Sequence, residues 1–175
     1  MIAMQGILQI DWQLLSAIEK IQNPVLNWFF ARITLLGNGG ILWIAIAIIL
    51  LLLPKTRRCG FAMAISLLLL LLLGNCLLKP LIARPRPFML REDLLLLIPK
   101  PSDFSFPSGH TYSGIASAIV ILRYYPRWGI SAMVLALLIA FSRLYLMVHF
   151  PTDVLGGILL GALCATCAIM ITQKR

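Results

Sequence analysis

Five nearly uncharged blocks, each close to the length that crosses a lipid bilayer, constrain the fold of this chain more than any other feature. A transmembrane helix needs about 20 mostly apolar residues. With 61% hydrophobic and 12% charged residues, the composition is that of a multi-pass membrane protein, which excludes an ordinary soluble domain. The sequence therefore predicts an all-α integral membrane bundle. The blocks occupy residues 33–53, 60–78, 108–122, 128–147 and 152–172.

Residues 1–32 differ in kind and predict an amphipathic helix that lies in the membrane interface. Apolar side chains recur on one helical face, and polar side chains lie opposite. Each charge at the centre of a spanning helix costs about 2.5–3.5 kcal/mol, which argues against a sixth span here. The charged residues of this segment are Asp11, Glu19, Lys20 and Arg32.

These blocks predict five transmembrane helices, with six as the alternative, preceded by the N-terminal interfacial helix. Residues 1–175 are expected to form one domain, with the bundle in residues 33–175. The chain begins MIAMQGILQIDW, without a basic region before an apolar core, so no removable signal peptide is expected. Cys164 and Cys167 have C-x-x-C spacing inside an apolar block, where we interpret them as small packing residues.

The basic residues predict which end of the bundle faces the cytoplasm. Because successive spans alternate in direction, loops 54–59 and 123–127 lie on the same side as the C-terminus, and this side carries no acidic residue. By the positive-inside rule it is the cytoplasmic side. The net charge of +9 then reflects topology and anionic lipids, and a nucleic-acid partner is not expected. The basic residues of this side are Lys55, Arg57, Arg58, Arg123, Arg127, Lys174 and Arg175.

The opposite, outer side gathers the remaining ionisable groups, in and beside the long segment 79–107. Arginine forks match phosphate oxygens two at a time, and lysine adds a point charge, so this set predicts a pocket for a highly charged anion. The alternative is that these cations extend to lipid headgroups and bind no substrate. We prefer this alternative for Arg91 and Lys100. The candidate set is Lys79, Arg84, Arg86, Ser108, His110, Arg143, His149 and Asp153.

The stretch FPSGHTYSG predicts a helix start that faces an anion. Pro107 suits the first turn, where free amide groups and the helix dipole favour negative charge. Gly109 allows close backbone approach, and the Ser108 hydroxyl can donate a hydrogen bond. The alternative, an ordinary helix start with a capping serine, leaves His110 without a purpose, although ionisable residues in membrane helices are usually functional.

The stretch HFPTD predicts an oriented imidazole. Asp153 follows His149 by one helical turn and can accept a proton from one ring nitrogen, which leaves the other free to attack. Asp153 could instead serve only the helix dipole. The chemistry predicted is phosphoryl transfer through His149, with His110 protonating the leaving oxygen and the cations neutralising the phosphoryl charge. No cluster has metal-ligand spacing, so neither a metal nor a cofactor is expected.

Three motifs in order resemble the signature of the type 2 phosphatidic acid phosphatase family, which is related to vanadium haloperoxidases and bacterial acid phosphatases. The family pattern K-x6-R-P is matched by Lys79 with Arg86 and Pro87, P-S-G-H by residues 107–110, and S-R-x5-H-x3-D by residues 142–153. Members commonly have six spans, whereas five are counted here. The resemblance covers residues 79–153.

The resemblance implies roles for the matched residues: His149 as nucleophile, Asp153 as its orienting partner and His110 as general acid. It implies that Lys79, Arg86, Ser108, Gly109 and Arg143 bind phosphate. Arg84 matches a wildcard position of the pattern and is an additional candidate.

The function that the resemblance implies is a metal-independent lipid phosphatase on the outer face of a bacterial cytoplasmic membrane. The preferred substrate is undecaprenyl pyrophosphate. Phosphatidylglycerophosphate, phosphatidic acid and lipid A 1-phosphate are alternatives, as is a phosphotransferase that passes the phosphoryl group to another lipid. The alternative from a different class is an anion-binding membrane protein without turnover, which should have lost a histidine or the aspartate.

Overall fold

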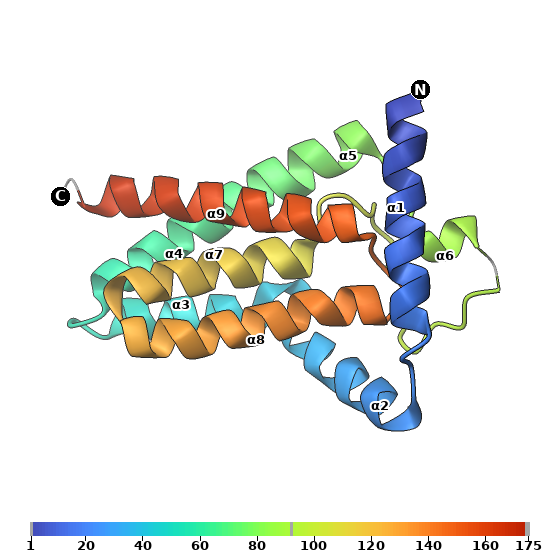
Figure 1. Ribbon diagram of the computed structural model, residues 1–175. Helices are drawn as coiled ribbons and strands as arrows, with labels where there is room; N and C mark the ends of the chain where they lie inside the picture. Colours follow the sequence, from blue (N-terminus) through green and yellow to red (C-terminus); the bar gives the residue numbers. More distant parts are fainter. Residues whose placement is uncertain (1, 92, 174–175) are drawn as a thin grey trace.

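The computed structural model describes residues 2–91 and 93–173, and within these ranges all regular structure is helical. Long helices lie side by side in a bundle, and one further helix crosses its end (Figure 1). The helices are α1 (Ile2–Glu19), α2 (Pro24–Ile33), α3 (Ile41–Leu52), α4 (Arg57–Leu70), α5 (Lys79–Ile82), α6 (Pro87–Leu90), α7 (Gly109–Tyr124), α8 (Pro126–Tyr145) and α9 (Pro151–Gln173). A 3₁₀ segment, η1 (Thr34–Gly40), joins α2 to α3, and a π-helical segment, η2 (Leu71–Leu78), joins α4 to α5.

The prediction of an all-α membrane bundle is confirmed. Each of the five predicted blocks corresponds to a segment of the bundle whose ends differ by a few residues, apart from the start of the first. Among the described residues, four stretches are long and apolar enough to cross a membrane. The α7 helix has 16 residues, is not one of the four, and is packed between them in the bundle. The four stretches are Pro24–Leu52, Arg57–Leu90, Pro126–Tyr145 and Pro151–Gln173.

The first span begins earlier than predicted, because α2 has its own start signal. The Asn23 side-chain oxygen accepts hydrogen bonds from the amides of Val25 at 3.1 Å and Leu26 at 3.0 Å. Pro24 takes the first helical position, which its fixed φ favours. Only α1, and not the whole of residues 1–32, therefore crosses the end of the bundle.

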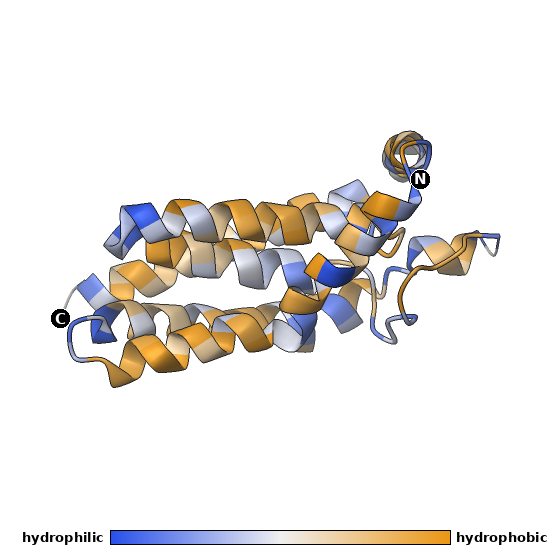
Figure 2. Cartoon of the chain, turned by 90° about the horizontal axis from the view of Figure 1, so that it is seen from below, coloured by the Kyte–Doolittle hydropathy of each residue, from blue (hydrophilic) through white to orange (hydrophobic). Residues whose placement is uncertain are grey.

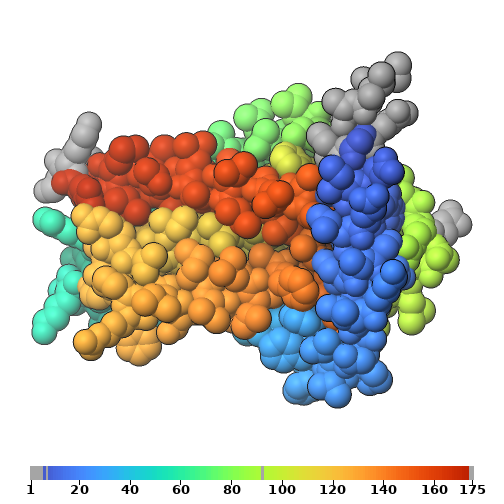
Figure 3. Space-filling model, viewed as in Figure 1, coloured from blue at the N-terminus to red at the C-terminus, as the bar shows by residue number. Residues whose placement is uncertain are grey.

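The α1 helix lies where the interfacial helix was predicted, across the end of the bundle (Figure 3). Leu15 is fully buried against the protein, in a small cluster with Met147 and Phe150. Ile10 and Leu14, on the neighbouring side of the helix, are about half exposed, with values of 57% and 49%. One side of α1 thus contacts the bundle, and an apolar side remains for lipid.

Small residues let α7 pack closely against its neighbours in the centre of the bundle. A Cβ atom on Gly161 of α9 would lie 2.7 Å from the carbonyl oxygen of Tyr112. One on Gly129 of α8 would lie 2.1 Å from the Cα atom of Leu122. Small interfacial residues are the usual means of close helix packing in membranes. This packing fixes α7, whose N-terminal end carries His110.

Polar residues gather at both ends of the bundle, and apolar residues cover its length (Figure 2). One end holds the α3–α4 and α7–α8 turns with their basic residues, and Lys174 and Arg175 lie outside the described residues. The other end holds α1, segment 79–107 and the starts of α7 and α9 (Figure 1). The three sequence motifs therefore meet at one end, as span parity predicts.

Candidate active site

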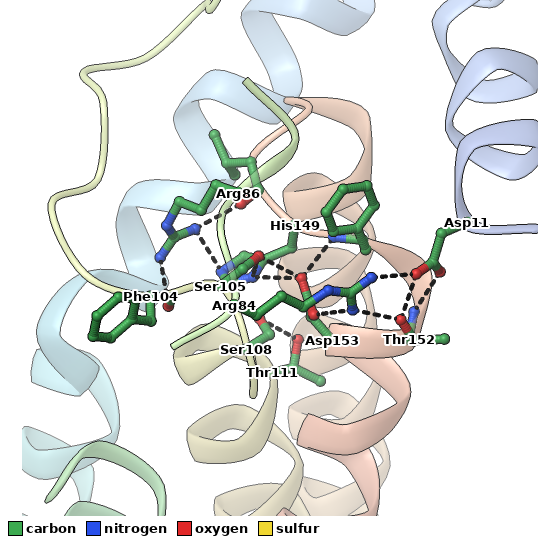
Figure 4. Close-up of polar contacts among 12 residues, drawn as sticks. Asp11, Arg84, Arg86, Phe104, Ser105, Ser108, Thr111, His149, Thr152 and Asp153 are labelled. Carbon is green, nitrogen blue, oxygen red and sulfur yellow. Dashed lines mark hydrogen bonds and ion pairs between the residues drawn. The ribbon is translucent and has the colours of Figure 1, made fainter. Parts of the chain in front are cut away.

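His149 lies in the short connection between α8 and α9, and Asp153 in the first turn of α9 holds its ring. The Nδ1 atom of His149 is 3.5 Å from the Asp153 Oδ2 atom, and both side chains are buried. The same Oδ2 accepts hydrogen bonds from the Ser105 hydroxyl at 2.5 Å and the Phe150 amide at 2.8 Å (Figure 4). These donors fix the carboxylate, and the carboxylate in turn fixes the imidazole.

The other ring nitrogen of His149, Nε2, faces a cation. It lies 3.0 Å from Nη1 of Arg86, and a guanidinium can only donate, so Nε2 is the acceptor and Nδ1 carries the proton. Burial lowers the pKa of His149 to about 3, reinforced by the charges of Arg86 and Arg143, although the contact with Asp153 opposes this. The imidazole is therefore neutral at physiological pH, and its Nε2 lone pair becomes free to attack once a bound phosphate takes over the Arg86 donor.

The Asp103 carboxylate forms ion pairs with both cations of the first motif. It forms an ion pair with Lys79, and its Oδ1 atom accepts a hydrogen bond of 2.6 Å from Nη2 of Arg86. Arg86 also donates to the carbonyl oxygens of Asp103 at 2.8 Å and Val148 at 2.6 Å. Lys79 stands at the end of the π-helical segment η2, an irregularity that is frequent at functional sites. Two buried cations are thus aimed at one anionic group.

Arg143, in the last turn of α8, supplies a third buried cation. Its Nη1 atom donates to the Thr34 hydroxyl at 2.5 Å, and its Nε atom has no partner among the described residues. A buried, unpartnered donor on a charged group is costly unless a ligand satisfies it. Arg143 is therefore suited to hold an anion beside His149.

His110, in the first turn of α7, is seated by the η1 turn. Its Nε2 atom lies 3.0 Å from the Asn38 side-chain oxygen, an acceptor, so the proton of the neutral ring is held on Nε2. A Cβ atom on Gly37 would lie 2.4 Å from Cδ2 of His110, which explains the glycine in the turn. Gly109, beside His110, leaves space next to Lys79, whose Nζ atom would be 3.8 Å from a Cβ atom there.

Two residues of the predicted anion pocket point elsewhere, and neither lines the cavity described below. The Ser108 hydroxyl is buried and accepts a 3.0 Å hydrogen bond from the Thr111 hydroxyl. Ser108 stands at the N-cap position of α7, and its backbone amide donates to the Asp153 carbonyl, which ties α7 to α9. Arg84 binds the carboxylates of Asp11 and Asp153 instead of facing the cations. The prolines beside Arg84 restrict its backbone, but they do not determine which carboxylates its side chain binds.

A cavity with a volume of about 830 Å³ joins the polar cluster to an apolar groove. At the polar end it is lined by three buried cations, Lys79, Arg86 and Arg143, and by both histidines. The exposed Lys100, for which the sequence favours a contact with lipid headgroups, also lines it. The groove continues between α3 and α4, where aliphatic side chains line it. Those residues are Ile44, Ala47, Ile48 and Leu51 of α3 and Ala64, Leu67, Leu68 and Leu70 of α4.

Sequence reasoning missed four polar residues of this end of the bundle: Asp11, Asn38, Asp103 and Ser105. For Asp11 a signal existed, because a lone acid four residues before Leu15 stands between apolar positions of an amphipathic helix. Asp103 and Ser105 lie in a loop, and Asn38 lies at a non-helical position of η1, so no periodicity marks their contacts. Among the described residues, no group of three or more His, Cys, Asp or Glu side chains is placed to hold a metal ion.

Comparisons with known proteins show the family to which the chain belongs. Residues 55–175 match the family model of the PAP2 superfamily. An undecaprenyl-diphosphatase of Sulfolobus acidocaldarius is 33% identical over 91% of this chain and 77% of its own length. A lipid A 4'-phosphatase of Porphyromonas gingivalis is 29% identical over 90% of this chain and 71% of its own.

A solved structure is similar over nearly the whole chain. The PAP2-type phosphatidylglycerolphosphate phosphatase of Bacillus subtilis superimposes with a TM-score of 0.77, at 31% identity, over 97% of this chain and 87% of its own. A family match over most of the chain, a relative above 30% identity and a shared membrane fold all point the same way. The chain therefore belongs to the PAP2 superfamily, the type 2 phosphatidic acid phosphatases, and is a multi-pass membrane lipid phosphatase.

Proposed function

We propose that this phosphatase cleaves a lipid pyrophosphate or phosphate monoester through a phosphohistidine on His149. The observation that supports this most directly is the cavity, which has three buried cations and two histidines at one end of an apolar groove. A phosphate bound among the cations would leave its lipid tail in the groove between α3 and α4. Each methylene kept out of water contributes about 0.8 kcal/mol, so such a site favours lipids over soluble esters.

In the first chemical step, Nε2 of His149 attacks phosphorus, and the bond from phosphorus to the lipid oxygen breaks as the phosphorus–nitrogen bond forms. The negative phosphate bound among the cations favours the imidazolium form of His110, which gives a proton to the leaving oxygen and becomes neutral. Asp153 stabilises the proton that remains on Nδ1 of His149. Lys79 and Arg86, once they release Asp103, neutralise the phosphoryl oxygens together with Arg143.

In the second step, a water oxygen attacks the phosphohistidine. Neutral His110 accepts the proton of the water, the phosphorus–nitrogen bond breaks, and its electron pair returns to Nε2 of His149. Inorganic phosphate leaves, and both histidines regain their starting protonation. The chain's own cations carry the charge stabilisation, so we expect activity without an added metal ion.

Undecaprenyl pyrophosphate is our preferred substrate, supported by the undecaprenyl-diphosphatase relative. Phosphatidylglycerophosphate, phosphatidic acid and lipid A phosphates are the alternatives, the first and last supported by the names of the other two similar proteins. The phosphate contacts are common to all of these lipids. A lipid acceptor in place of water would make the enzyme a phosphotransferase.

We further propose that the site faces the outer side of a bacterial cytoplasmic membrane. The support is the charge of the opposite end, where Lys55, Arg57 and Arg58 precede and begin α4, and Arg123 and Arg127 flank the α7–α8 turn. Cytoplasmic loops carry an excess of such residues.

The test is phosphate release by the purified chain in detergent from undecaprenyl pyrophosphate, phosphatidylglycerophosphate, phosphatidic acid, lipid A and glycerol 3-phosphate. We expect kcat/KM for the lipids to exceed that for glycerol 3-phosphate by at least about 100-fold. The His149→Ala variant should release no phosphate and form no acid-labile phosphoenzyme. Equal efficiency on phosphatidic acid and glycerol 3-phosphate would contradict the lipid assignment, and a fully active His149→Ala variant would contradict the mechanism.

The His110→Ala variant tests the leaving group as well as the general acid. Loss of a general acid lowers kcat by about 10²–10⁴ when the leaving oxygen is an alkoxide. A pyrophosphate releases a lipid phosphate, a much weaker base that needs a proton less. We expect the rate of phosphoenzyme formation in the His110→Ala variant to fall less with undecaprenyl pyrophosphate than with phosphatidic acid. This rate excludes the second step, in which His110 acts on water with either substrate, so an equal fall with both would remove His110 from the general-acid role.

A further inference from the structure

The α1 helix sends one carboxylate into the protein, directly behind the proposed catalytic pair. Asp11 is fully buried. Its Oδ1 atom accepts the Thr152 amide at 3.0 Å, and its Oδ2 atom accepts the Thr152 hydroxyl and Nη2 of Arg84, each at 2.6 Å. Figure 4 shows Asp11 reaching the start of α9 from a separate helix. A buried carboxylate with this many donors is fixed in place.

Arg84 joins this carboxylate to Asp153. Its Nη1 atom donates to Oδ1 of Asp153 at 2.6 Å and to the Thr152 hydroxyl at 2.7 Å. The guanidinium also stacks on the Phe150 ring, with Cζ 4.3 Å from the ring centre. The two oxygens of Asp153 therefore have separate tasks: Oδ1 binds Arg84, and Oδ2 faces His149.

The charge balance of this chain depends on Asp11. One guanidinium serves two buried carboxylates, so Arg84 is shared between Asp11 and Asp153. Without the charge of Asp11, the whole guanidinium charge would fall on Asp153. The Asp153 carboxylate would then be drawn towards Arg84 and would stabilise the proton of His149 less well.

We propose that Asp11 is a positioning residue for the Asp153–His149 pair and acts through Arg84, which makes α1 part of the catalytic apparatus as well as a membrane anchor. The proposal rests on the proposed roles of His149 and Asp153. It also explains why Arg84 lies outside the cavity although it stands between two cation-bearing positions of the first motif.

The same helix offers a matched control. Glu19 of α1 pairs with Arg91 at 2.5 Å, but both side chains are partly exposed, with values of 39% and 30%, and neither contacts Asp153. The Asp11→Asn and Glu19→Gln variants therefore each remove one acidic partner of an arginine from α1, and only the first reaches the catalytic pair.

The experiment compares phosphate release and vanadate inhibition in the full chain. For Asp11→Asn we expect kcat to fall by about 10-fold to 100-fold, the usual effect of losing a group that orients a catalytic residue. KM and the vanadate inhibition constant should stay within about twofold, because Lys79, Arg86 and Arg143 are untouched. Glu19→Gln should keep kcat within about twofold.

A double-mutant cycle then tests the route. Because Asp11 is proposed to act through Arg84, the loss in the Asp11→Asn/Arg84→Gln variant should be no larger than the greater of the two single losses. If Asp11→Asn does not fold, Arg84→Lys carries the test: it keeps the charge but cannot reach both carboxylates, so kcat should fall as in Asp11→Asn.

The possible failures are distinguishable. An active wild-type chain with an equally active Asp11→Asn variant would overturn this inference alone. So would additive losses in the cycle, or a parallel loss of kcat, vanadate binding and thermal stability, which indicates a merely structural contact. A wild-type chain that releases no phosphate from any lipid would overturn the proposed function and this inference with it.

Discussion

At the scale of single residues, Asp103 stands where the substrate phosphate is proposed to bind. Burial alone would raise the pKa of Asp103, but Lys79 and Arg86 outweigh it and lower the pKa to about 2. The carboxylate is therefore ionised at every physiological pH. A phosphate that enters the cavity must displace it from both cations.

We expect the Asp103→Asn variant to bind vanadate about threefold to tenfold more tightly, because a neutral amide competes less for Lys79 and Arg86. This range corresponds to about 0.7–1.4 kcal/mol, which two partly exposed ion pairs of up to about 1 kcal/mol each can supply. Vanadate inhibition of phosphate release measures the effect. Asp93→Asn is the control, since Asp93 lies on the same segment and, within residues 2–91 and 93–173, its one ion pair is with Arg91. Weaker vanadate binding in Asp103→Asn would show that the carboxylate organises the cations and does not compete with the ligand.

The lowered pKa of His149 makes a second prediction at this scale. The native ring stays neutral down to about pH 3, whereas the ring in the unfolded chain takes a proton near its ordinary pKa of 6.5. The unfolded state therefore binds more protons between these values, and stability falls as pH falls through this window. From pH 6.5 to pH 5 the loss should reach up to about 2 kcal/mol.

Thermal unfolding in detergent at pH 7.5 and pH 5 measures this loss, and the chosen window lies above the titration of Asp103. The His149→Gln variant is the control, because it keeps a polar side chain without a titrating ring. We expect a smaller decrease in Tm between the two pH values for His149→Gln than for the wild-type chain. An equal decrease would mean that His149 already titrates normally in the folded chain.

At the scale of elements, the groove between α3 and α4 is proposed to hold the lipid tail. Ala64 of α4 lines it, and Ala45 of α3 is exposed outside the cavity lining. We expect Ala64→Phe to raise KM for dipalmitoyl phosphatidic acid by about tenfold, since a bulky ring displaces buried methylenes worth about 0.8 kcal/mol each. KM for the dihexanoyl lipid should change little, and Ala45→Phe should affect neither. Phosphate release measures KM for each lipid. An equal effect of Ala64→Phe on the dipalmitoyl and dihexanoyl lipids would place the tail outside this groove.

The elements themselves were largely predictable, because a bilayer-length apolar run allows few structures other than a helix. The exception is the division between α1 and α2. The amphipathic pattern continues across Asn23 and Pro24, although this pair is a standard helix start, so periodicity alone merged two helices. The motifs were placed correctly at one end because span parity is a counting argument. The partners of Arg84 and Ser108 were not predicted, because they depend on which helices distant in sequence come into contact.

At the scale of the whole molecule, orientation decides which compartment receives the phosphate. In a variant whose cysteines at 59, 76, 164 and 167 are replaced, Asp93→Cys should react with a membrane-impermeant thiol reagent in intact cells. Pro126→Cys, at the basic end, should react only after the membrane is opened. Both positions are exposed in the structure, so a lack of labelling reports the membrane and not burial. The reverse pattern would place the chemistry in the cytoplasm.

Because the cavity joins a polar end of the bundle to its apolar groove, the two products of the proposed reaction depart into different phases. The shortened lipid returns to the two dimensions of the bilayer, whereas inorganic phosphate is diluted into the three dimensions of the surrounding water. Reversal requires both to meet again at one protein. Dilution thus drives hydrolysis towards completion without any coupled energy source.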